Sequence, residues 1–215
     1  MSTRLISVTM KLADTPPRKT GRPLSFDRED VLEKAMLAFW KSGYETTSIS
    51  DLTATMGLTA PSLYAAFGNK QQLFLEAMRR YAGDRTAMET SIMDAPTARD
   101  AVTAMLRGAA VLYTGETTPP GCLLASAAAT GSPEAADVRE AIAAERREVR
   151  EIIIRRIEAD VEKGLMSSDT CSKTLADLTL AVTQGMSVLA RDGADRDSLL
   201  AIADAATLGW SIYEI

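Results

Sequence analysis

The chain has 215 residues, a formal net charge of −5 and no histidine, and 46% of its residues are hydrophobic. This composition is typical of a globular protein with a sizeable core, and no apolar run approaches the roughly 20 residues that a membrane-spanning helix needs. The missing histidine removes the commonest general base and metal ligand, and two cysteines without metal-ligand spacing are too few for a disulfide framework. We therefore expect a cytoplasmic protein that is not an enzyme and has no metal or cofactor.

The charge is distributed unevenly along the chain. Residues 1–80 carry 11 Lys and Arg against 8 Asp and Glu, a net charge of +3, whereas the remaining residues carry 13 against 21, a net charge of −8. A basic segment followed by an acidic one predicts that only the N-terminal part meets an anionic partner such as nucleic acid.

The predicted elements are all helical, because good helix formers dominate and no alternating run of β-branched residues is long enough for a strand. Residues 1–24 hold three prolines with basic residues between them, and we expect a disordered basic arm there. A first helix is predicted from its N-cap at Asp27 to a stop at Gly43. The further predicted helices cover about residues 48–56, 59–67, 70–93, 99–113, 122–129, 134–162, 175–190 and 197–213. The fold class is thus all-α, with about nine helices.

Two of the short predicted helices meet at a tight turn. Gly57 supplies the turn because glycine readily adopts a positive φ, and Met56 and Leu58 flank it. Leu52 and Leu63 lie where they can meet across the angle between the two helices. This is the pattern of a helix-turn-helix, in which the first helix braces and the second enters the major groove. Two amphipathic helices around a glycine also occur in many other α-helical proteins, so the spacing alone leaves DNA binding open.

The surrounding residues resemble one known family. The segments that carry the resemblance are TTSISDL at 46–52, MGLT at 56–59, SLYAAFGNK at 62–70 and LF at 73–74. Together they closely resemble the DNA-binding domain of the tetracycline-repressor (TetR) family over about residues 22–80. One departure is Thr53, where the family usually has alanine, and we expect its hydroxyl to be satisfied within the helix.

The resemblance implies a domain organisation and a function. It divides the chain into the arm at 1–24, a helix-turn-helix DNA-binding domain at 25–70 and a ligand-binding and dimerisation domain at 71–215. It implies a homodimeric transcriptional repressor that a small molecule releases from its operator. Regulation by a corepressor, or activation in place of repression, stays open.

The family pattern assigns phosphate contacts to the helix-turn-helix. They are expected from Thr47, Ser48, Thr59, Tyr64 and Lys70, and from the helix N-terminus at Thr47, which is a natural anion site. Other roles remain open at this stage: Thr47, Ser48 and Thr59 are also suitable N-caps, Tyr64 could be a core aromatic residue, and Lys70 could be an ordinary surface lysine.

Base contacts are expected from Ala60, Pro61, Ser62 and Ala65. These side chains are small and mostly apolar, so sequence readout should depend on thymine methyl groups, on Ser62 and on DNA shape. Arg22 stands in a Gly-Arg-Pro sequence that resembles minor-groove arms of the AT-hook type. The alternative for this arm is a solvated basic tail.

The C-terminal part should hold a ligand cavity and a dimer interface. Candidate ligand-binding residues are Met105, Leu106, Ala109, Leu112, Tyr113, Cys122, Leu123, Ala127, Ile142 and Val149, and their apolar character favours an apolar or weakly polar ligand. Thiol-oxidant sensing by Cys122 is a minor alternative, because nothing nearby activates it. Candidate interface residues are Leu178, Val182, Met186, Leu189, Ile202, Ala206, Trp210 and Tyr213. A dimer places two recognition helices about 34–36 Å or more apart, which predicts a palindromic operator.

Two other classes of protein compete with this interpretation. An enzyme is disfavoured because the chain has no Gly-rich phosphate loop and no nucleophile beside an acid–base pair, and because the glutamates and arginines of residues 145–156 read as a solvated, salt-bridged helix face. A helical protein that acts only through other proteins, without ligand sensing, is disfavoured by the basic N-terminal part and the small side chains at residues 60–65.

Overall fold

The computed structural model describes residues 26–127 and 135–214, and regular structure within these ranges is helical apart from an isolated bridge between Met166 and Glu214. The α-helices, in order, are α1 (Arg28–Ser42), α2 (Ile49–Met56), α3 (Ala60–Phe67), α4 (Lys70–Ala82), α5 (Arg85–Met93), α6 (Ala98–Tyr113), α7 (Leu123–Ala127), α8 (Ala136–Glu162), α9 (Ser172–Arg191) and α10 (Arg196–Leu208), and a 3-10 helix, η2 (Gly209–Tyr213), follows α10. The all-α prediction is confirmed. The predicted arm and Arg22 lie outside the described residues.

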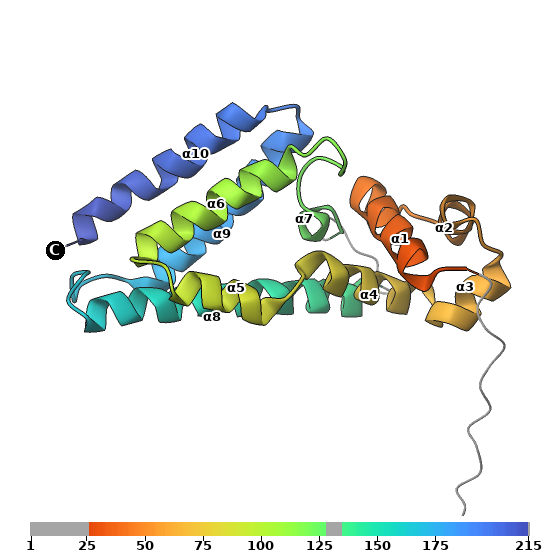
Figure 1. Ribbon diagram of the computed structural model, residues 1–215, viewed down its shortest axis with the longest axis horizontal. Helices are drawn as coiled ribbons and strands as arrows, with labels where there is room; N and C mark the ends of the chain where they lie inside the picture. Colours follow the sequence, from red (N-terminus) through yellow and green to blue (C-terminus); the bar gives the residue numbers. More distant parts are fainter. Residues whose placement is uncertain (1–25, 128–134, 215) are drawn as a thin grey trace, which may run out of the picture.

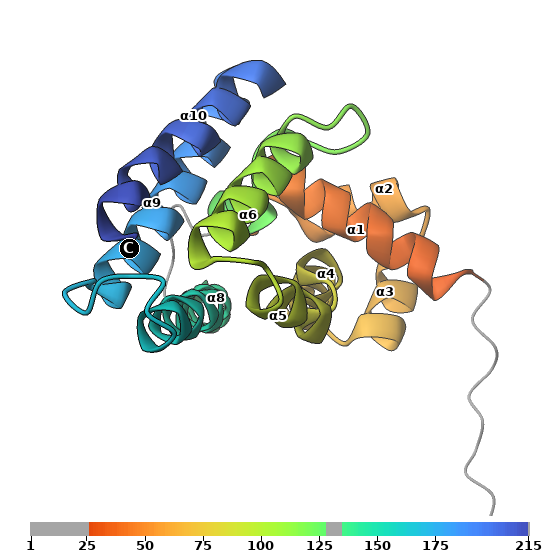
Figure 2. The same ribbon diagram turned by 60° about the vertical axis from the view of Figure 1, so that its left-hand side comes forward.

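The molecule is elongated, with α1–α3 at one end (Figure 1). We call α1–α3 the head and α4–α10 the body. Helix α8 runs lengthwise beside α4 and α5, and α6, α9 and α10 pack together on the side of the body away from α2 and α3 (Figures 1 and 2). Among the described residues, no helix combines the length and apolarity that crossing a bilayer requires.

Two large apolar cores hold this arrangement together. The first joins the head to α4 and contains buried Phe39, Leu63 and Phe74, and it extends to Leu123 of α7 and Ile142 of α8. The second lies within the body and joins α6, α8, α9 and α10. Helices α4, α7 and α8 therefore connect the head to the body.

The prediction of one helix over residues 70–93 is wrong, because the chain breaks at Gly83 and Asp84. Gly83 ends α4 with a positive φ of 69°, and the Asp84 carboxylate then accepts hydrogen bonds from the backbone N–H groups of Thr86 and Ala87. A glycine that stops one helix, followed at once by an aspartate that caps the next, is a standard helix boundary. The break lets α5 begin as a separate helix beside α8 (Figure 1).

A buried ion pair fixes the connection between α5 and α6 to α8. Arg156 and Asp160 are 1% and 0% exposed, and the Arg156 Nη1 to Asp160 Oδ1 distance is 2.5 Å. Arg156 also donates to the carbonyls of Ala95 and Pro96, and the Asp160 carboxylate accepts from the backbone N–H of Ala98. The pair thereby anchors the backbone of the α5–α6 turn to α8.

Candidate DNA-binding face and ligand pocket

Helix α3 has one buried and one exposed side. Leu63 and Phe67 are buried in the first core, while Pro61, Tyr64 and Ala65 are exposed. The Tyr64 side chain is 47% exposed, so the alternative of a core aromatic residue is wrong. The exposed side of α3 is thus an uncharged surface of small groups and one phenol, and Ala60 and Ser62, at its edge, are half-buried.

The turn between α2 and α3 has the geometry that the sequence predicts. Gly57 adopts a left-handed conformation with φ 69°, and the N–H of Leu58 donates to the carbonyl of Thr53 at 3.0 Å. The Thr53 hydroxyl donates to the Ile49 and Ser50 carbonyls. This residue, which departs from the family pattern, therefore leaves no unsatisfied group in the brace helix.

Hydroxyl groups cap both helices of this unit. Ser48 and Asp51 form a reciprocal capping box at α2, with the Asp51 N–H donating to Ser48 Oγ at 3.1 Å. Asp51 is fully exposed, and its pKa is lowered chiefly by the hydrogen bond from the Ser48 side chain. Thr59 caps α3 by accepting from the Ser62 N–H at 3.4 Å. Both capping residues are exposed, and the Ser48 hydroxyl itself donates to the Asp51 carboxylate at 2.6 Å.

Thr47 does not have the environment that a phosphate contact needs. Its side chain is 2% exposed, and its hydroxyl donates to the Gly43 carbonyl at 2.6 Å. The hydroxyl proton is therefore engaged inside the molecule, where it ties the loop before α2 to the end of α1. The expectation of a phosphate contact from this hydroxyl is incorrect in this conformation, whereas Ser48 beside it faces solvent.

Lys70 is held in place at the first position of α4. Its Nζ lies 4.6 Å from the centroid of the Tyr44 ring and donates to the Glu45 carbonyl at 3.3 Å. Burial lowers the pKa of Lys70, and Glu45 and Asp51 oppose that shift. A lysine restrained on an aromatic ring beside the helix-turn-helix is a preoriented cation rather than a freely moving surface group.

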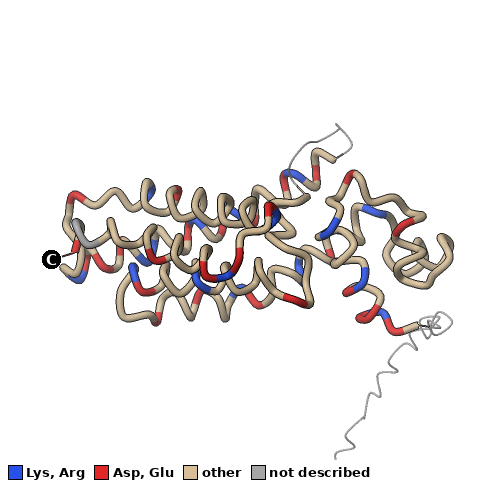
Figure 3. Tube along the Cα trace, turned by 90° about the horizontal axis from the view of Figure 1, so that it is seen from above, with Lys and Arg blue, Asp and Glu red and all other residues tan. Residues whose placement is uncertain are grey.

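The head has few charges where α2 and α3 meet. Asp51 is the one charged residue in positions 46–69, and this region, at the right-hand end of the tube in Figure 3, is almost entirely tan. Positive charge for binding phosphates must therefore come from the flanks of the unit. Lys70 is such a flanking cation within the described residues.

The body contains a mainly apolar pocket with a cavity volume of about 280 Å³. Of the predicted ligand-binding residues, those that line it are Met105, Ala109, Leu112, Tyr113, Cys122 and Val149. Sequence reasoning missed further lining residues, which are Tyr81, Ala82, Arg85, Met88, Leu124, Glu145, Arg146, Leu180, Thr183 and Gln184. Helix α4 thus contributes to the pocket and the head core at the same time.

The other predicted ligand-binding residues are packed elsewhere, and these predictions need correction. Leu106 is 1% exposed inside the second core. Leu123, Ala127 and Ile142 belong to the first core, where α7 and the start of α8 pack against the head. Their apolar character reflects core packing in the observed arrangement, because neighbouring helices already cover them.

One end of the pocket is polar. The Tyr81 hydroxyl donates to Cys122 Sγ at 3.3 Å, and Cys122 is a buried free thiol. Burial raises the pKa of both Tyr81 and Tyr113, and Cys122 adds to the shift. Both phenols therefore stay protonated at neutral pH.

A junction of buried groups connects this end of the pocket to the head. Trp40 of α1 donates from Nε1 to the Gly121 carbonyl at 3.0 Å, and its ring packs edge-on against Tyr81 with centroids 4.8 Å apart. The next residue, Cys122, donates its backbone N–H to Ser187 Oγ of α9 at 2.8 Å. The residues at the pocket end are thus in direct contact with both α1 and α9.

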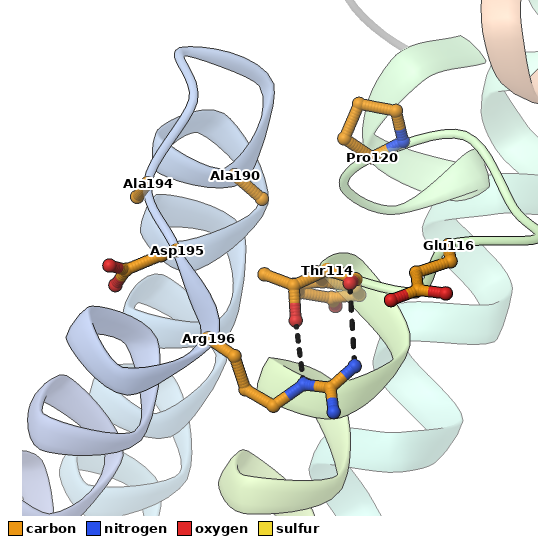
Figure 4. A pocket seen from close by; sticks show the side chains of 9 residues that line it. Thr114, Glu116, Pro120, Ala190, Ala194, Asp195 and Arg196 are labelled. Carbon is orange, nitrogen blue, oxygen red and sulfur yellow. Dashed lines mark hydrogen bonds between the residues drawn. The ribbon is translucent and has the colours of Figure 1, made fainter.

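A second, more open cleft lies between the end of α6 and the start of α10, with a volume of about 460 Å³. Figure 4 shows Arg196 reaching across it to Thr114, where it donates to Oγ1 at 3.3 Å and to the carbonyl at 3.4 Å. Its lining shares Tyr113 with the pocket in the body but otherwise comes from loops and helix ends.

The predicted dimer-interface residues fall into three groups. Met186 and Trp210 are 0% and 2% exposed within this chain's own second core, so their assignment to a surface between chains is incorrect in this conformation. Leu178 and Leu189 are 48% and 41% exposed. The half-buried members at the edge of the same core are Val182, Ile202, Ala206 and Tyr213.

The exposed side of α9 carries an apolar stripe that sequence reasoning identified only in part. Leu178, Ala181, Gly185 and Val188 are exposed at helical spacing, and Val188 is 55% exposed. On α10, Ala201, Ala205 and Leu208 are exposed at the same kind of spacing, and Leu208 is 62% exposed. Exposed apolar stripes on two adjacent helices are typical of a surface that a partner covers.

Comparisons with known proteins agree with the fold and with the helix-turn-helix. The family model described as bacterial regulatory proteins, tetR family, matches residues 31–77. The chain is 32% identical over 200 residues to the HTH-type transcriptional repressor ComR of Escherichia coli (strain K12), covering 90% of this chain and 93% of that protein. It is 30% identical over 133 residues to the HTH-type transcriptional repressor BdcR of the same organism, covering 61% of this chain and 65% of that protein.

Solved structures extend the likeness to both parts of the molecule. A cysteine mutant of the TetR family transcriptional regulator CifR, complexed with 26-base-pair double-strand operator DNA, is 39% identical with a TM-score of 0.83, covering 88% of this chain and 100% of that chain. A TetR transcriptional regulator from Chloroflexus aurantiacus is 25% identical with a TM-score of 0.75, covering 87% and 95%. With its helix-turn-helix head and its helical body, this chain belongs to the TetR family of DNA-binding transcriptional regulators.

Proposed function

We propose that the chain is a homodimeric repressor that binds a palindromic operator and is released from it by a small molecule in the body pocket. The observation that carries this proposal is the exposed, uncharged side of α3, which is held at a fixed angle to α2 by Gly57. The operator complex of CifR and the repressor names of ComR and BdcR support it. A repressor of chromosomal genes acts in the cytoplasm.

In this proposal, α3 lies in the major groove and reads bases through Ala60, Pro61, Ser62 and Ala65. These groups suit thymine methyl contacts and shape readout more than bidentate hydrogen bonding, so each half-site contributes modest specificity. Dimerisation then supplies the rest, because two half-sites must be bound together.

Phosphate contacts in the proposal come from the edge of the same unit. The groups are the α2 N-terminus at Ser48, the hydroxyls of Thr59 and Tyr64, and the ammonium of Lys70. A helix N-terminus attracts an anion through its free N–H groups and its dipole. Arg22, in the arm that precedes the described residues, is proposed to enter the adjacent minor groove.

The exposed stripes of α9 and α10 are the proposed dimer interface. Two helices from each chain then form a four-helix bundle, and Gly185 allows a close approach between backbones. Leu178, Val188, Leu189 and Leu208 are the residues whose exposure this interface would remove.

Release requires that the effector bind one conformation of the dimer more tightly than the other. The junction of Trp40, Gly121 and Tyr81 supports such coupling, because the residues at the polar end of the pocket contact α1 directly. An effector that moves Tyr81 or the Gly121 segment therefore acts on the orientation of the head.

The test of this function is to incubate the purified protein with fragmented genomic DNA and to sequence the fragments that it retains. A palindromic motif is the expected result, and a dimer of defined mass on that motif supports the homodimer. If a folded dimer retains no motif by itself but does so with a cell extract of small molecules, the corepressor mechanism takes the place of release. No enrichment in either case would contradict the DNA-binding proposal.

A further inference from the structure

The charges around the body pocket are unevenly paired. Arg85, Glu145 and Arg146 are the charged residues that line it. Arg85 is engaged, because it forms an ion pair with Glu145 and a second one, at 2.9 Å, with Glu148 outside the pocket. No carboxylate lies within ion-pair distance of Arg146 among the residues that the structure describes. With Glu148 counted, the four charges sum to zero, but both carboxylates pair with Arg85, so Arg146 is the lining charge that has no ion-pair partner among the described residues.

The guanidinium of Arg146 also has an unused donor. Its Nη2 donates to the carbonyl of Leu124 at 3.0 Å, but its Nε is buried and has no acceptor within the described part of the chain. A buried donor without a partner is costly, and native proteins leave few of them. Arg146 lines the pocket, so a ligand there can bring an acceptor to its guanidinium, and the planar fork of arginine fits a carboxylate best.

The remaining lining residues indicate that the part of the ligand away from Arg146 is apolar. Met88, Met105, Ala109, Val149 and Leu180 give apolar walls, and the cavity volume of about 280 Å³ suits a short chain or a single ring with a linker.

The two phenols of the pocket add no negative charge that would oppose a carboxylate. Tyr81 and Tyr113 both carry hydroxyls that burial keeps protonated, and both are close enough to Cys122 to interact with it. Glu145 would repel a second negative charge on the ligand. A ligand with one negative charge is therefore favoured over a neutral ligand, which would leave Arg146 unpaired. It is also favoured over a ligand with two negative charges, which Glu145 would repel.

We propose that the effector of this pocket is a small apolar molecule that ends in a single carboxylate, and that Arg146 binds the carboxylate. The inference rests on the proposed function in one respect, since it takes the pocket to be the effector site. The inference goes beyond the proposed function by naming the chemical class of the effector and the residue that selects this class.

The test compares pairs of probes that share an apolar body and differ in the head group: octanoate with octanamide, and phenylbutyrate with phenylbutyramide. Binding to the full-length protein is measured by calorimetry and by the shift in unfolding temperature. We expect the carboxylates to bind about tenfold more tightly than their amides, the size of one charge-assisted hydrogen bond. The carboxylates should also release the operator in a band-shift assay, at concentrations that follow their affinities.

Variants of Arg146 test whether this residue causes the preference for carboxylates over amides. Arg146→Met should abolish the preference for carboxylates over amides, and Arg146→Lys should keep part of it, because the charge remains. The matched control is Arg147→Met, since the neighbouring Arg147 is exposed and pairs with Glu140 at 2.5 Å on the outer surface of α8. The control should keep the full preference.

Several outcomes overturn the proposal. Equal binding of acids and amides, binding of none of the probes, or a carboxylate preference that survives in Arg146→Met each contradict it. Binding of the carboxylates without release of the operator contradicts their role as effectors. These results are distinct from a failure of the proposed function, which would appear as absent operator binding by the unliganded wild-type protein.

Discussion

In the head, the residues proposed to face DNA within the described structure lie between positions 48 and 70, whereas the pocket of the body is lined by residues from 81 to 184. The head depends on local devices: a capping box, a glycine turn and a short amphipathic helix, each complete within a few residues. The pocket of the body brings together residues from six helices, and its polar end forms only where α4, the end of α6 and the residue before α7 meet. Caps and turns that involve a few neighbouring residues can be predicted from the sequence. A pocket assembled from distant segments cannot, because its lining depends on how the helices pack.

The largest expected loss of stability comes from a buried ion pair in the body, and it contrasts with the small loss expected from an exposed ion pair in the head. Asp160→Asn leaves Arg156 buried without its charged partner, and we expect the free energy of unfolding to fall by about 3–5 kcal/mol. Asp30→Asn in the head removes the exposed pair between Lys34 and Asp30 and should cost less than about 0.5 kcal/mol. Urea denaturation measures both. Similar losses for the two variants would contradict the distinction.

The next effect concerns the junction between the regions. A Cβ at Gly121 would lie 2.7 Å from the Ser187 carbonyl oxygen, at a positive φ of 80°. Gly121→Ala should therefore lower the free energy of unfolding by about 3 kcal/mol, from the combined strain and steric overlap. Gly164→Ala is the matched control, because Gly164 has a φ of 70° and open space around it, so about 1 kcal/mol is expected.

The Gly121→Ala variant also sharpens the role of the junction. If the junction transmits the effector's action, the remaining folded protein should bind the operator but respond less to an effector than the Gly164→Ala control does. An unchanged response, measured by band shift at a temperature where both variants are folded, would place the coupling elsewhere, in the continuous path from the pocket along α4.

Within the head, sequence readout and phosphate binding should be separable. Lys70→Ala should weaken binding to every operator variant alike and reduce the salt dependence of the affinity by about one unit of slope. Pro61→Gln should instead alter the preferred base at one position, because glutamine can pair with adenine in the major groove. Fluorescence anisotropy on a set of singly altered operators distinguishes them. Uniform losses for both variants would refute the division of roles.

The smallest expected effect tests the local character of the head. Ser48→Ala removes the hydrogen bonds of the Ser48 hydroxyl, which accepts from the Asp51 N–H and donates to the Asp51 carboxylate, while the backbone N–H of residue 48 keeps its bond to that carboxylate. The variant should destabilise the head by about 1 kcal/mol. Ser50→Ala, on an exposed residue two positions later, should be nearly neutral. Because loss of the Ser48 hydrogen bond also returns the pKa of Asp51 toward its ordinary value, the variant's deficit should shrink as the pH falls through the range where Asp51 is protonated. A deficit independent of pH would contradict this account of the cap.

The fold was predictable where a residue type has one strong local use. Gly57, Thr59 and Pro61 mark the turn and the start of α3, and the structure has them in those positions. Gly83 and Asp84 form an equally local boundary, but the apolar pattern on both sides continues at helical spacing and concealed it. Thr47 was misassigned for a related reason, since a threonine at a helix start can face solvent or the preceding turn, and only tertiary packing decides which.

The site in the body was predictable only by composition. Leu123 and Ile142 are as apolar as Met105 and Val149, yet the first two pack beneath the head and the last two line the pocket. Arg146 gave no signal in the sequence, because it stands in a helix of alternating charges. The arginines of that helix that form ion pairs with carboxylates include Arg147, Arg150, Arg155 and Arg156. The distinct role of Arg146 depends on which neighbouring carboxylates are already engaged, and that follows from the three-dimensional arrangement.

The placement of the tryptophans gives the molecule two built-in optical reporters. The sequence contains two tryptophans: Trp40 belongs to the core of the head and Trp210 to the core of the body. Trp40→Phe leaves an emission that monitors only the body, and Trp210→Phe leaves one that monitors only the head. Equilibrium unfolding followed with each variant therefore reveals whether the two cores melt together or in sequence, and whether an effector stabilises one of them before the other.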